Sequence, residues 1–421
     1  MNGVLYLQIC KRNNNMTTWN KRSLDGKIDR GIFWVLIGLF VVPIYVREMV
    51  LSNFYQANIF AVLGCFFILY STFKGGKLGE QYFIPYALII CLTIILILSE
   101  IHAGRTVQGF IRVFLGLIMP LPLLFYEMYN PQKTIRVVLS VFKWVSLLIV
   151  ILGIIDRFAG GQLIVLYYKL AHDSNYAEMA SNSTRLHSYI GHPLYNAELF
   201  LMTLGLNFTY NELVKKNHKN DIWTILLTMI GVAMTASKSA IAIFIALLIV
   251  FYMKNIKYMF FCLLLLTVGY FNGLFDLVLQ RFSGSLTTGR AEVWGRISSK
   301  GIKFFHFFWG NGSDSKYSYA YLEEWARAAF EYPYRLYALE FGILFTILIF
   351  LLIFIIPEFR IIKNRTGMVW LSITFLAVVV HVNMYNGIGT YSDPMYLFCL
   401  FGCVVLNMST LVRREEIIKN E

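Results

Sequence analysis

The chain has 421 residues, of which 57% are hydrophobic and 14% are charged, and its mean hydropathy is +0.60. Soluble globular domains carry about 25% charged residues, so this composition excludes an ordinary water-soluble enzyme. The net charge of +13 does not indicate nucleic-acid binding, because the basic residues lie between apolar runs rather than together on a polar surface. We therefore predict an all-α polytopic membrane protein that forms a single membrane-embedded domain over 1–421.

Twelve apolar runs are predicted as membrane spans. A helix that crosses a bilayer needs about 20 apolar residues, so twelve spans would use about 240 of the 421 residues and leave about 180 for loops and tails. The weakest part is the stretch 222–253, where Ser237, Lys238 and Ser239 interrupt one long apolar run. The predicted spans are 32–46, 54–73, 82–99, 111–126, 138–155, 194–210, 222–236, 239–253, 257–275, 336–356, 367–386 and 394–411.

Basic residues indicate the orientation, because cytoplasmic loops of membrane proteins carry an excess of Lys and Arg. With twelve spans, the basic tails 1–31 and 412–421 fall on one side, together with most basic residues of the short loops. Both termini are therefore predicted to be cytoplasmic, and the Ser-Lys-Ser break to be a tight external turn. The short external loops hold only Arg47, Arg105, Arg112 and Lys238.

Two long segments, 156–193 and 276–335, are then external, and the second joins the ninth span to the tenth. Arg290, Val293, Trp294 and Ile297 recur at helical spacing in the second segment and predict a helix with one shared face. The run 303–309, with sequence KFFHFFW, predicts an interfacial helix with its rings in the headgroup region.

Ionisable residues gather at one level of the predicted bundle, at the external ends of the spans. Such residues at membrane depth are functional candidates, although near a helix end they also snorkel to the interface. Their cations would hold an anionic group such as a lipid diphosphate, and aromatic rings of the loops would stack on sugars. This arrangement favours a lipid-linked glycan as substrate. The residues are Arg112, Asp156, Arg157, Glu198, Lys238, Asp276, Arg335 and His381.

Neither metal nor cofactor is predicted. The six cysteines lie in the N-terminal tail or in apolar runs, so no disulfide framework is expected in the loops. No His, Cys or Asp spacing matches a metal site, and no motif matches a nucleotide-binding loop.

Three segments, in this order, carry a resemblance. The first is Arg185-Leu-His-Ser-Tyr-Ile-Gly-His-Pro-Leu-Tyr-Asn-Ala, an arginine followed by Gly-His-Pro at the start of a span. The second is the turn Thr235-Ala-Ser-Lys-Ser-Ala. The third holds Thr288-Gly-Arg-Ala-Glu-Val-Trp and the glycine pair Gly310-Asn-Gly312.

These segments resemble those of the O-antigen ligase and Wzy-type polysaccharide polymerase superfamily, over roughly 180–345 by motif and over the whole chain by architecture. Lys238 stands where the family usually has arginine. Ligases typically begin the last segment with His-Asn, followed by a glycine eleven positions later. Here Glu331 is at the histidine position and Gly342 at the glycine position. Polymerases often carry an acidic residue there, so the resemblance favours a polymerase.

The resemblance implies a GT-C-like helical bundle and metal-independent glycosyl transfer at the outer face of the bacterial plasma membrane. The donor would be an undecaprenyl-diphosphate-linked oligosaccharide, and in a polymerase a second lipid-linked unit is the acceptor. A flippase and a chain-length regulator would be partner proteins, and no nucleic acid takes part.

The leaving group would be a lipid diphosphate, which requires neutralisation of its charge and a base for the attacking hydroxyl. Arg290 is assigned to the diphosphate; the alternative is an ion pair with Glu292. Glu331 is the candidate base; the alternative is an ion pair with Arg327, one helical turn earlier. The substrate-binding candidates are Arg185, His192, Lys238, Trp294, Tyr332, Tyr334 and Arg335.

Two other functions stay open. One is a ligase that moves a finished glycan to a different acceptor. The other is a flippase or transporter of the same lipid-linked substrate, although short loops, charges near the midplane and related halves would be expected of it.

Overall fold

The computed structural model describes residues 29–51, 56–74, 80–218, 221–253, 256–283, 289–323, 325–363, 368–389 and 392–420. Helices make up 78% of these residues, and no strand occurs among them. The N-terminal tail predicted at 1–31 lies outside the described residues up to residue 28. The prediction of an all-α protein is confirmed.

Five helices are long and apolar enough to cross a membrane, and up to seven do so if each of two bent pairs is one span. The bent pairs are Arg30–Val41 with Ile44–Leu51 and Lys257–Phe271 with Asp276–Phe282. These helices agree with the predicted multi-pass membrane protein, but they are fewer than the twelve predicted spans. The five are Tyr82–His102, Val107–Leu124, Pro131–Phe158, Ile343–Lys363 and Asp393–Arg413.

Five predicted spans remain: 194–210 is the 18-residue helix α12 (Pro193–Tyr210), and the other four are shorter apolar helices. They are α5 (Ile59–Lys74), α13 (Asp221–Thr235), α14 (Lys238–Tyr252) and α21 (Val369–Met384). A 15-residue helix rises only about 22 Å, which is less than the roughly 30 Å of a bilayer core. Composition alone did not reveal that these helices are short, because the apolar runs continue past the residues where the helices end.

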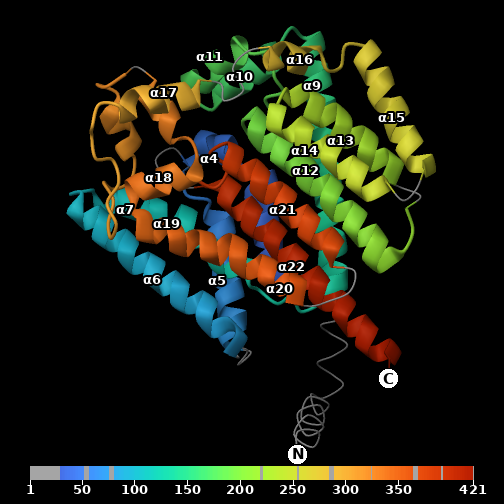
Figure 1. The fold of residues 1–421 in the computed structure, drawn as a ribbon, viewed down its shortest axis with the longest axis horizontal. Helices are drawn as coiled ribbons and strands as arrows, with labels where there is room; N and C mark the ends of the chain where they lie inside the picture. Colours follow the sequence, from blue (N-terminus) through green and yellow to red (C-terminus); the bar gives the residue numbers. More distant parts are fainter. Residues whose placement is uncertain are drawn as a thin grey trace, which may run out of the picture.

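The interior of the bundle is built around α12 (Pro193–Tyr210) and α22 (Asp393–Asn420). Nearly every residue of α12 is buried, and the helix packs against α9 (Pro131–Phe158), α13 and α21 (Figure 1). A helix that is apolar on all sides must be enclosed by other helices or by lipid, and α12 is enclosed by helices.

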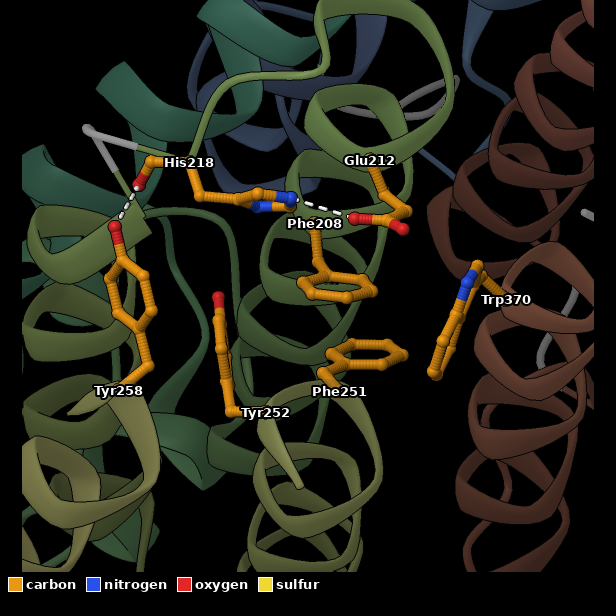
Figure 2. A pocket seen from close by; sticks show the side chains of 7 residues that line it. All are labelled: Phe208, Glu212, His218, Phe251, Tyr252, Tyr258 and Trp370. Carbon is orange, nitrogen blue, oxygen red and sulfur yellow. Dashed lines mark hydrogen bonds and ion pairs between the residues drawn. The ribbon is translucent and has the colours of Figure 1, made fainter. Parts of the chain in front are cut away.

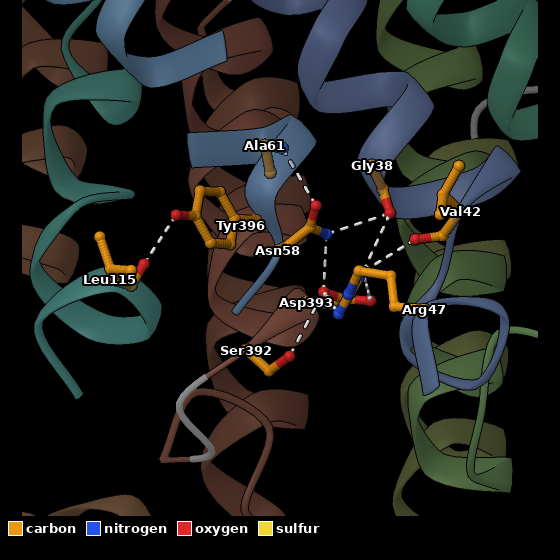
Figure 3. Close-up of polar contacts among 9 residues, drawn as sticks. All are labelled: Gly38, Val42, Arg47, Asn58, Ala61, Leu115, Ser392, Asp393 and Tyr396. Carbon is orange, nitrogen blue, oxygen red and sulfur yellow. Dashed lines mark hydrogen bonds and ion pairs between the residues drawn. The ribbon is translucent and has the colours of Figure 1, made fainter. Parts of the chain in front are cut away.

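The first apolar run breaks after α3 (Arg30–Leu36) and the π-helical η1 (Ile37–Val41), and the chain turns by 83° into α4 (Ile44–Leu51). Pro43 cannot donate a backbone hydrogen bond at the break. Arg47 instead donates to the carbonyl of Val42 (2.8 Å) and to both carboxylate oxygens of Asp393 (2.8 and 3.2 Å; Figure 3). Arg47 is thus a fully buried residue of α4, whereas the sequence predicted it in a short external loop.

Short helices from the two long loop segments gather at one end of the bundle, at the top of Figure 1, whereas α22 ends at the opposite side. The first loop forms α10 (Gln162–Leu170) and α11 (Ser174–Ser181). The second loop begins with α16 (Asp276–Phe282) and α17 (Arg290–Ser298). The helix predicted around Arg290 and Trp294 is therefore confirmed.

The segment 303–309 is not helical, so the predicted interfacial helix is wrong. Its backbone has another use: the carbonyls of His306 and Phe307 accept hydrogen bonds from the amides of Ile343 and Leu344 (2.9 Å each). These amides begin α19 (Ile343–Phe350) and have no partner within the helix. The extended segment therefore caps a span, and local sequence gives no sign of that pairing.

The glycine pair after this segment allows two backbones to meet. The amides of Asn311 and Gly312 donate to the carbonyls of Leu339 and Glu340 (2.9 Å each), at the end of α18 (Pro333–Glu340). A Cβ on Gly310 would overlap the backbone of Glu340. The large loop is thus fixed to the start of the next span.

Candidate functional site

The centre of the candidate site is the turn between α13 and α14. Thr235 ends α13, Ala236 adopts a left-handed conformation with φ of 48°, and Ser237 caps α14 by accepting from the amide of Ala240 (3.3 Å). The predicted tight turn at Ser-Lys-Ser is confirmed. The turn leaves two consecutive carbonyls, of Thr235 and Ala236, available to side chains from elsewhere.

Two arginines use these carbonyls. Arg185 donates from Nε to Thr235 (2.9 Å), and the backbone beside it is held by a hydrogen bond from the amide of Leu186 to Met234 (2.8 Å). Arg281, from α16, donates to Ala236 (2.6 Å). Within the described residues no carboxylate contacts either guanidinium, and Nη2 of Arg185 is buried without a hydrogen-bond partner. The structure thus brings two uncompensated cations onto one turn.

Two histidines extend this cationic group. The rings of His187 and His192 lie 5.8 Å apart. Burial, followed by the charge of Arg185, lowers the pKa of His187 to about 4. Burial also lowers the pKa of His192, and Arg185, His187, Arg290 and Arg281 lower it further. Both rings are therefore neutral near pH 7, in surroundings that disfavour any further positive charge.

His192 has a local structural use. As the N-cap of α12 it accepts a hydrogen bond from the amide of Leu194 on Nδ1 (3.2 Å). This capping contact gives His192 a role that needs no substrate.

The two predicted catalytic residues pair with each other. Arg290, the first residue of α17, donates from Nε to the carboxylate of Glu331 (2.7 Å) and from Nη1 to the carbonyl of Met384 (3.4 Å). Neither alternative ion pair, Arg290 with Glu292 or Glu331 with Arg327, is the one formed here, and Arg327 packs over the ring of Trp325. The structure therefore joins the two predicted catalytic residues in one ion pair.

The aromatic candidates form a group around Arg335. Its guanidinium carbon lies 4.4 Å from the ring centre of Trp294, 5.2 Å from that of Tyr332 and 5.5 Å from that of Tyr334. Phe305 stacks on Trp294 as well (5.7 Å). Arg335 and Phe305 thus cover part of the Trp294 ring, whereas Tyr334 is 44% exposed.

Lys238 lies beside the arginines. It begins α14 directly after the turn, and its ammonium group is 5.7 Å from the ring centre of Phe282, the residue that follows Arg281. The structure therefore places Lys238, Arg185 and Arg281 around one turn, and Arg290 contributes to the same electrostatic environment. Sequence reasoning missed Arg281, although its position where an apolar run enters the external loop was a usable signal.

A second polar group follows the Met384 carbonyl that accepts from Arg290. Its members Glu198 and His381 are among the ionisable residues singled out from the sequence but not among the substrate-binding candidates, and Tyr385 was missed. Tyr385 follows Met384 and donates its hydroxyl to Oε2 of Glu198, in the second turn of α12. His381 packs against the Tyr385 ring (5.1 Å) and makes a 3.3 Å hydrogen bond to the hydroxyl of Ser239. Glu198 is fully buried, and its Oε1 has no partner.

A cavity of about 240 Å³ lies at the opposite end of α13, near its first residue Asp221 (Figure 2). It is about 20 Å from the turn, given the rise of a 15-residue helix. None of the predicted site residues lines it. Its walls are Phe208, Glu212, His218, Phe251, Tyr252, Tyr258 and Trp370.

The arginine group can bind an anion with several oxygens. Arg185 and Arg281 are oriented by carbonyls that carry no full charge, so their attraction for a phosphate is not cancelled. Partial burial strengthens this attraction relative to water. Within the described residues no three His, Cys, Asp or Glu side chains lie together as a metal site would need. No protein-family model matches the chain, and no curated protein matches its sequence.

Proposed function

We propose that the protein polymerises lipid-linked oligosaccharide repeat units into a surface polysaccharide, at the outer face of the bacterial plasma membrane. The observation that carries the proposal is the meeting of Arg185, Arg281 and Arg290 at the end of the bundle where the two long loops lie. A diphosphate leaving group requires such a set of donors, and O-antigen, capsule and exopolysaccharide repeat units are assembled on undecaprenyl diphosphate.

In this proposal the diphosphate binds to Arg185 and Arg281 and competes with Glu331 for Arg290. Lys238 adds a point charge at the same turn. When the phosphate oxygens take Arg290, the Glu331 carboxylate is released and becomes the base for the attacking hydroxyl. The bond from the anomeric carbon to the diphosphate oxygen breaks, its electron pair leaves with the diphosphate, and a new glycosidic bond forms.

The proposed topology has twelve crossings, with both termini cytoplasmic and a GT-C-like arrangement. The shorter helices would then cross a locally thin or protein-filled region rather than a full hydrocarbon layer. The loop helices, gathered at one end, support an external site between the ninth and tenth crossings. Undecaprenyl-diphosphate oligosaccharide would be both donor and acceptor, with a flippase and a chain-length regulator as partner proteins.

The test is a reconstituted assay with purified protein and a lipid-diphosphate oligosaccharide, without added metal or nucleotide. A product ladder at multiples of the repeat unit supports the polymerase. Transfer to a different acceptor without a ladder supports a ligase instead. Movement of substrate across the bilayer with no new glycosidic bond returns the protein to the class of flippases.

A further inference from the structure

Helix α10 of the first long loop carries an apolar stripe that the described part of the chain leaves exposed. Leu163, Leu166 and Leu170 follow the i, i+3, i+7 spacing of one helix face and are 47%, 56% and 60% exposed. Gln162 and Lys169, which are also exposed, lie along one edge of the stripe. Exposed leucines in a row beside a polar edge are typical of a helix that lies in a membrane interface.

The opposite face of α10 is buried in the protein. Val165 and Tyr168 pack with Tyr45 of α4 in a separate apolar cluster. The carboxylate of Asp156, near the end of α9, accepts a hydrogen bond from the amide of Ile164 (3.1 Å). The orientation of α10 is therefore fixed, with the leucine stripe turned outward.

The length of α9 indicates the depth at which α10 lies. Its 28 residues rise roughly 42 Å, about the thickness of a bilayer with its headgroup regions, so a span of this length ends among the headgroups. Gly160 and Gly161 then turn the chain in left-handed conformations, and α10 begins at the next residue (Figure 1). An exposed apolar face extends to the last residue of α9 along Trp144, Leu148, Ile151, Ile155 and Phe158.

A bilayer fits the leucine stripe better than a protein partner does. A nine-residue helix is roughly 14 Å long, so its stripe is far smaller than the roughly 800 Å² that each partner of a stable protein interface buries. Lys169 suits a lipid surface as well, because its stem can lie along acyl chains while its ammonium group reaches the phosphates. Lipid would also cover the exposed face of α9, the span from which α10 continues.

Helix α10 also holds the segment that carries part of the arginine group. The hydroxyls of Tyr167 and Tyr168 donate to the carbonyls of Tyr189 and Ser188 (3.0 Å each). Arg185 is three residues before Ser188 in the same segment. The depth of α10 in the membrane therefore determines the depth of Arg185.

We propose that α10 lies in the lipid leaflet on the side of the loop helices, with Leu163, Leu166 and Leu170 among the acyl chains, and that it holds Arg185 at the level of the lipid phosphates. This leaflet is the outer one in the proposed topology. An anionic lipid headgroup then reaches Arg185 without leaving the leaflet. The inference goes beyond the proposed function, because a ligase or a flippase of the same lipid would need the same depth. A failed ladder assay therefore leaves it untouched.

The experiment measures the depth of single nitroxide labels on the full-length protein, one copy per phosphatidylcholine–phosphatidylglycerol nanodisc. The labels are attached to introduced cysteines in a C10S/C91S background, whose four remaining cysteines are buried. Electron paramagnetic resonance gives the collision rate of each label with oxygen, which concentrates among acyl chains, and with a nickel chelate, which stays in water. L148C on α9 is the standard for the acyl-chain region, and S299C is the standard for water.

The oxygen-to-nickel ratio at L163C, L166C and L170C should exceed that at S299C several-fold and approach that at L148C. K169C is the matched control, because it is an exposed position on the polar edge of the same helix, and its ratio should be lower than those of the stripe. T184C, next to Arg185 and exposed, should give a ratio between the two standards. A stripe variant that melts below the background protein is set aside, and the other stripe positions decide.

Three results would overturn the inference. Stripe labels with the ratio of S299C would show that α10 faces water. Stripe labels protected from both reagents would show that protein, not lipid, covers the leucines. Labels at T184C that match S299C would show that Arg185 lies outside the headgroup level.

Discussion

Arg290 and Glu331 occupy each other in the structure, whereas Arg185 and Arg281 contact only backbone carbonyls. This difference separates two duties. In the proposed mechanism, Arg185 and Arg281 bind the diphosphate directly, whereas Arg290 first exchanges its carboxylate partner for the phosphate. Substrate binding and the release of the proposed base Glu331 would then be one event.

Neutralising one arginine of this group should reduce polymer formation strongly. R185Q, R281Q and R290Q each remove a charged hydrogen-bond donor, and roughly 10- to 100-fold loss of activity is expected. The measurement is the ladder assay at equal protein amounts in the membrane. R296Q is the control, because Arg296 is on the same helix as Arg290 but pairs with Glu323 at an exposed position. Normal ladders from R281Q would remove Arg281 from the site.

His218 should make stability depend on pH. One ring nitrogen lies 2.7 Å from Glu212 (Figure 2), and the other lies 2.7 Å from Asp221. Ionised carboxylates only accept hydrogen bonds, so both nitrogens carry protons when both contacts form. Burial disfavours the charged ring, but Asp221 and Glu212 outweigh this and raise the pKa of His218. The stabilisation is complete below the unfolded pKa of about 6.5 and is lost as pH rises through the folded value.

Melting temperatures of wild type and H218Q, measured between pH 6 and pH 9, test this expectation. The melting temperature of the wild type should exceed that of H218Q most at pH 6, and this difference should shrink toward pH 9. Parallel curves would show that the ring is held by packing against Phe208 (5.5 Å) rather than by its charge.

At the scale of elements, the contact between the large loop and α18 depends on Gly310. A methyl group there would overlap the backbone of Glu340 and Phe341, which cannot rotate away. We expect G310A to lower the melting temperature and to lose activity, by displacing the loop that carries α17. G295A is the control: that glycine lies within α17 with open space around its Cβ position, and alanine should stabilise a helix there by up to about 1 kcal/mol. Equal stability of the two variants would contradict the contact.

The buried pair of Arg47 and Asp393 holds the broken first span against α22. Removing one member leaves the other as a buried charge, so R47M or D393L alone should cost about 3–5 kcal/mol. The double variant R47M/D393L should recover much of that loss, because two apolar groups need no partner. Thermal unfolding in the same detergent measures all three. Equal losses in single and double variants would mean that the pair contributes by shape alone.

At the scale of the whole molecule, the proposed twelve-crossing topology would place the two ends of the bundle on opposite sides of the membrane. Cysteines introduced at the exposed positions Ser299 and Asn217 should therefore react differently with a membrane-impermeant reagent in intact cells. S299C should be labelled from outside and N217C only after lysis. Labelling of both from outside, or of both only after lysis, would contradict the topology, and the second result would also move the arginine site to the cytoplasm.

The local sequence predicted a good part of the architecture. Periodic apolar runs predicted the helices, the Ser-Lys-Ser interruption predicted the turn at 235–237, and the spacing of Val293 and Ile297 predicted α17. These features follow from short-range physics: apolar period, capping side chains and backbone preference. The same reasoning predicted a helix at 303–309 that the structure does not contain. There, hydrogen bonds to Ile343 and Leu344 outweigh the local preference for a helix.

Composition by itself indicated a membrane protein, because the interior of a soluble protein of this length could not bury so large a share of apolar residues. It also showed where the charges lie along the chain. Which charges meet was decided only by the tertiary structure. Arg290 is paired with Glu331, 41 positions away, and Arg281 reaches a turn 45 positions earlier. The energy of a charge depends on its burial and its neighbours, and both are set by helix packing across the bundle.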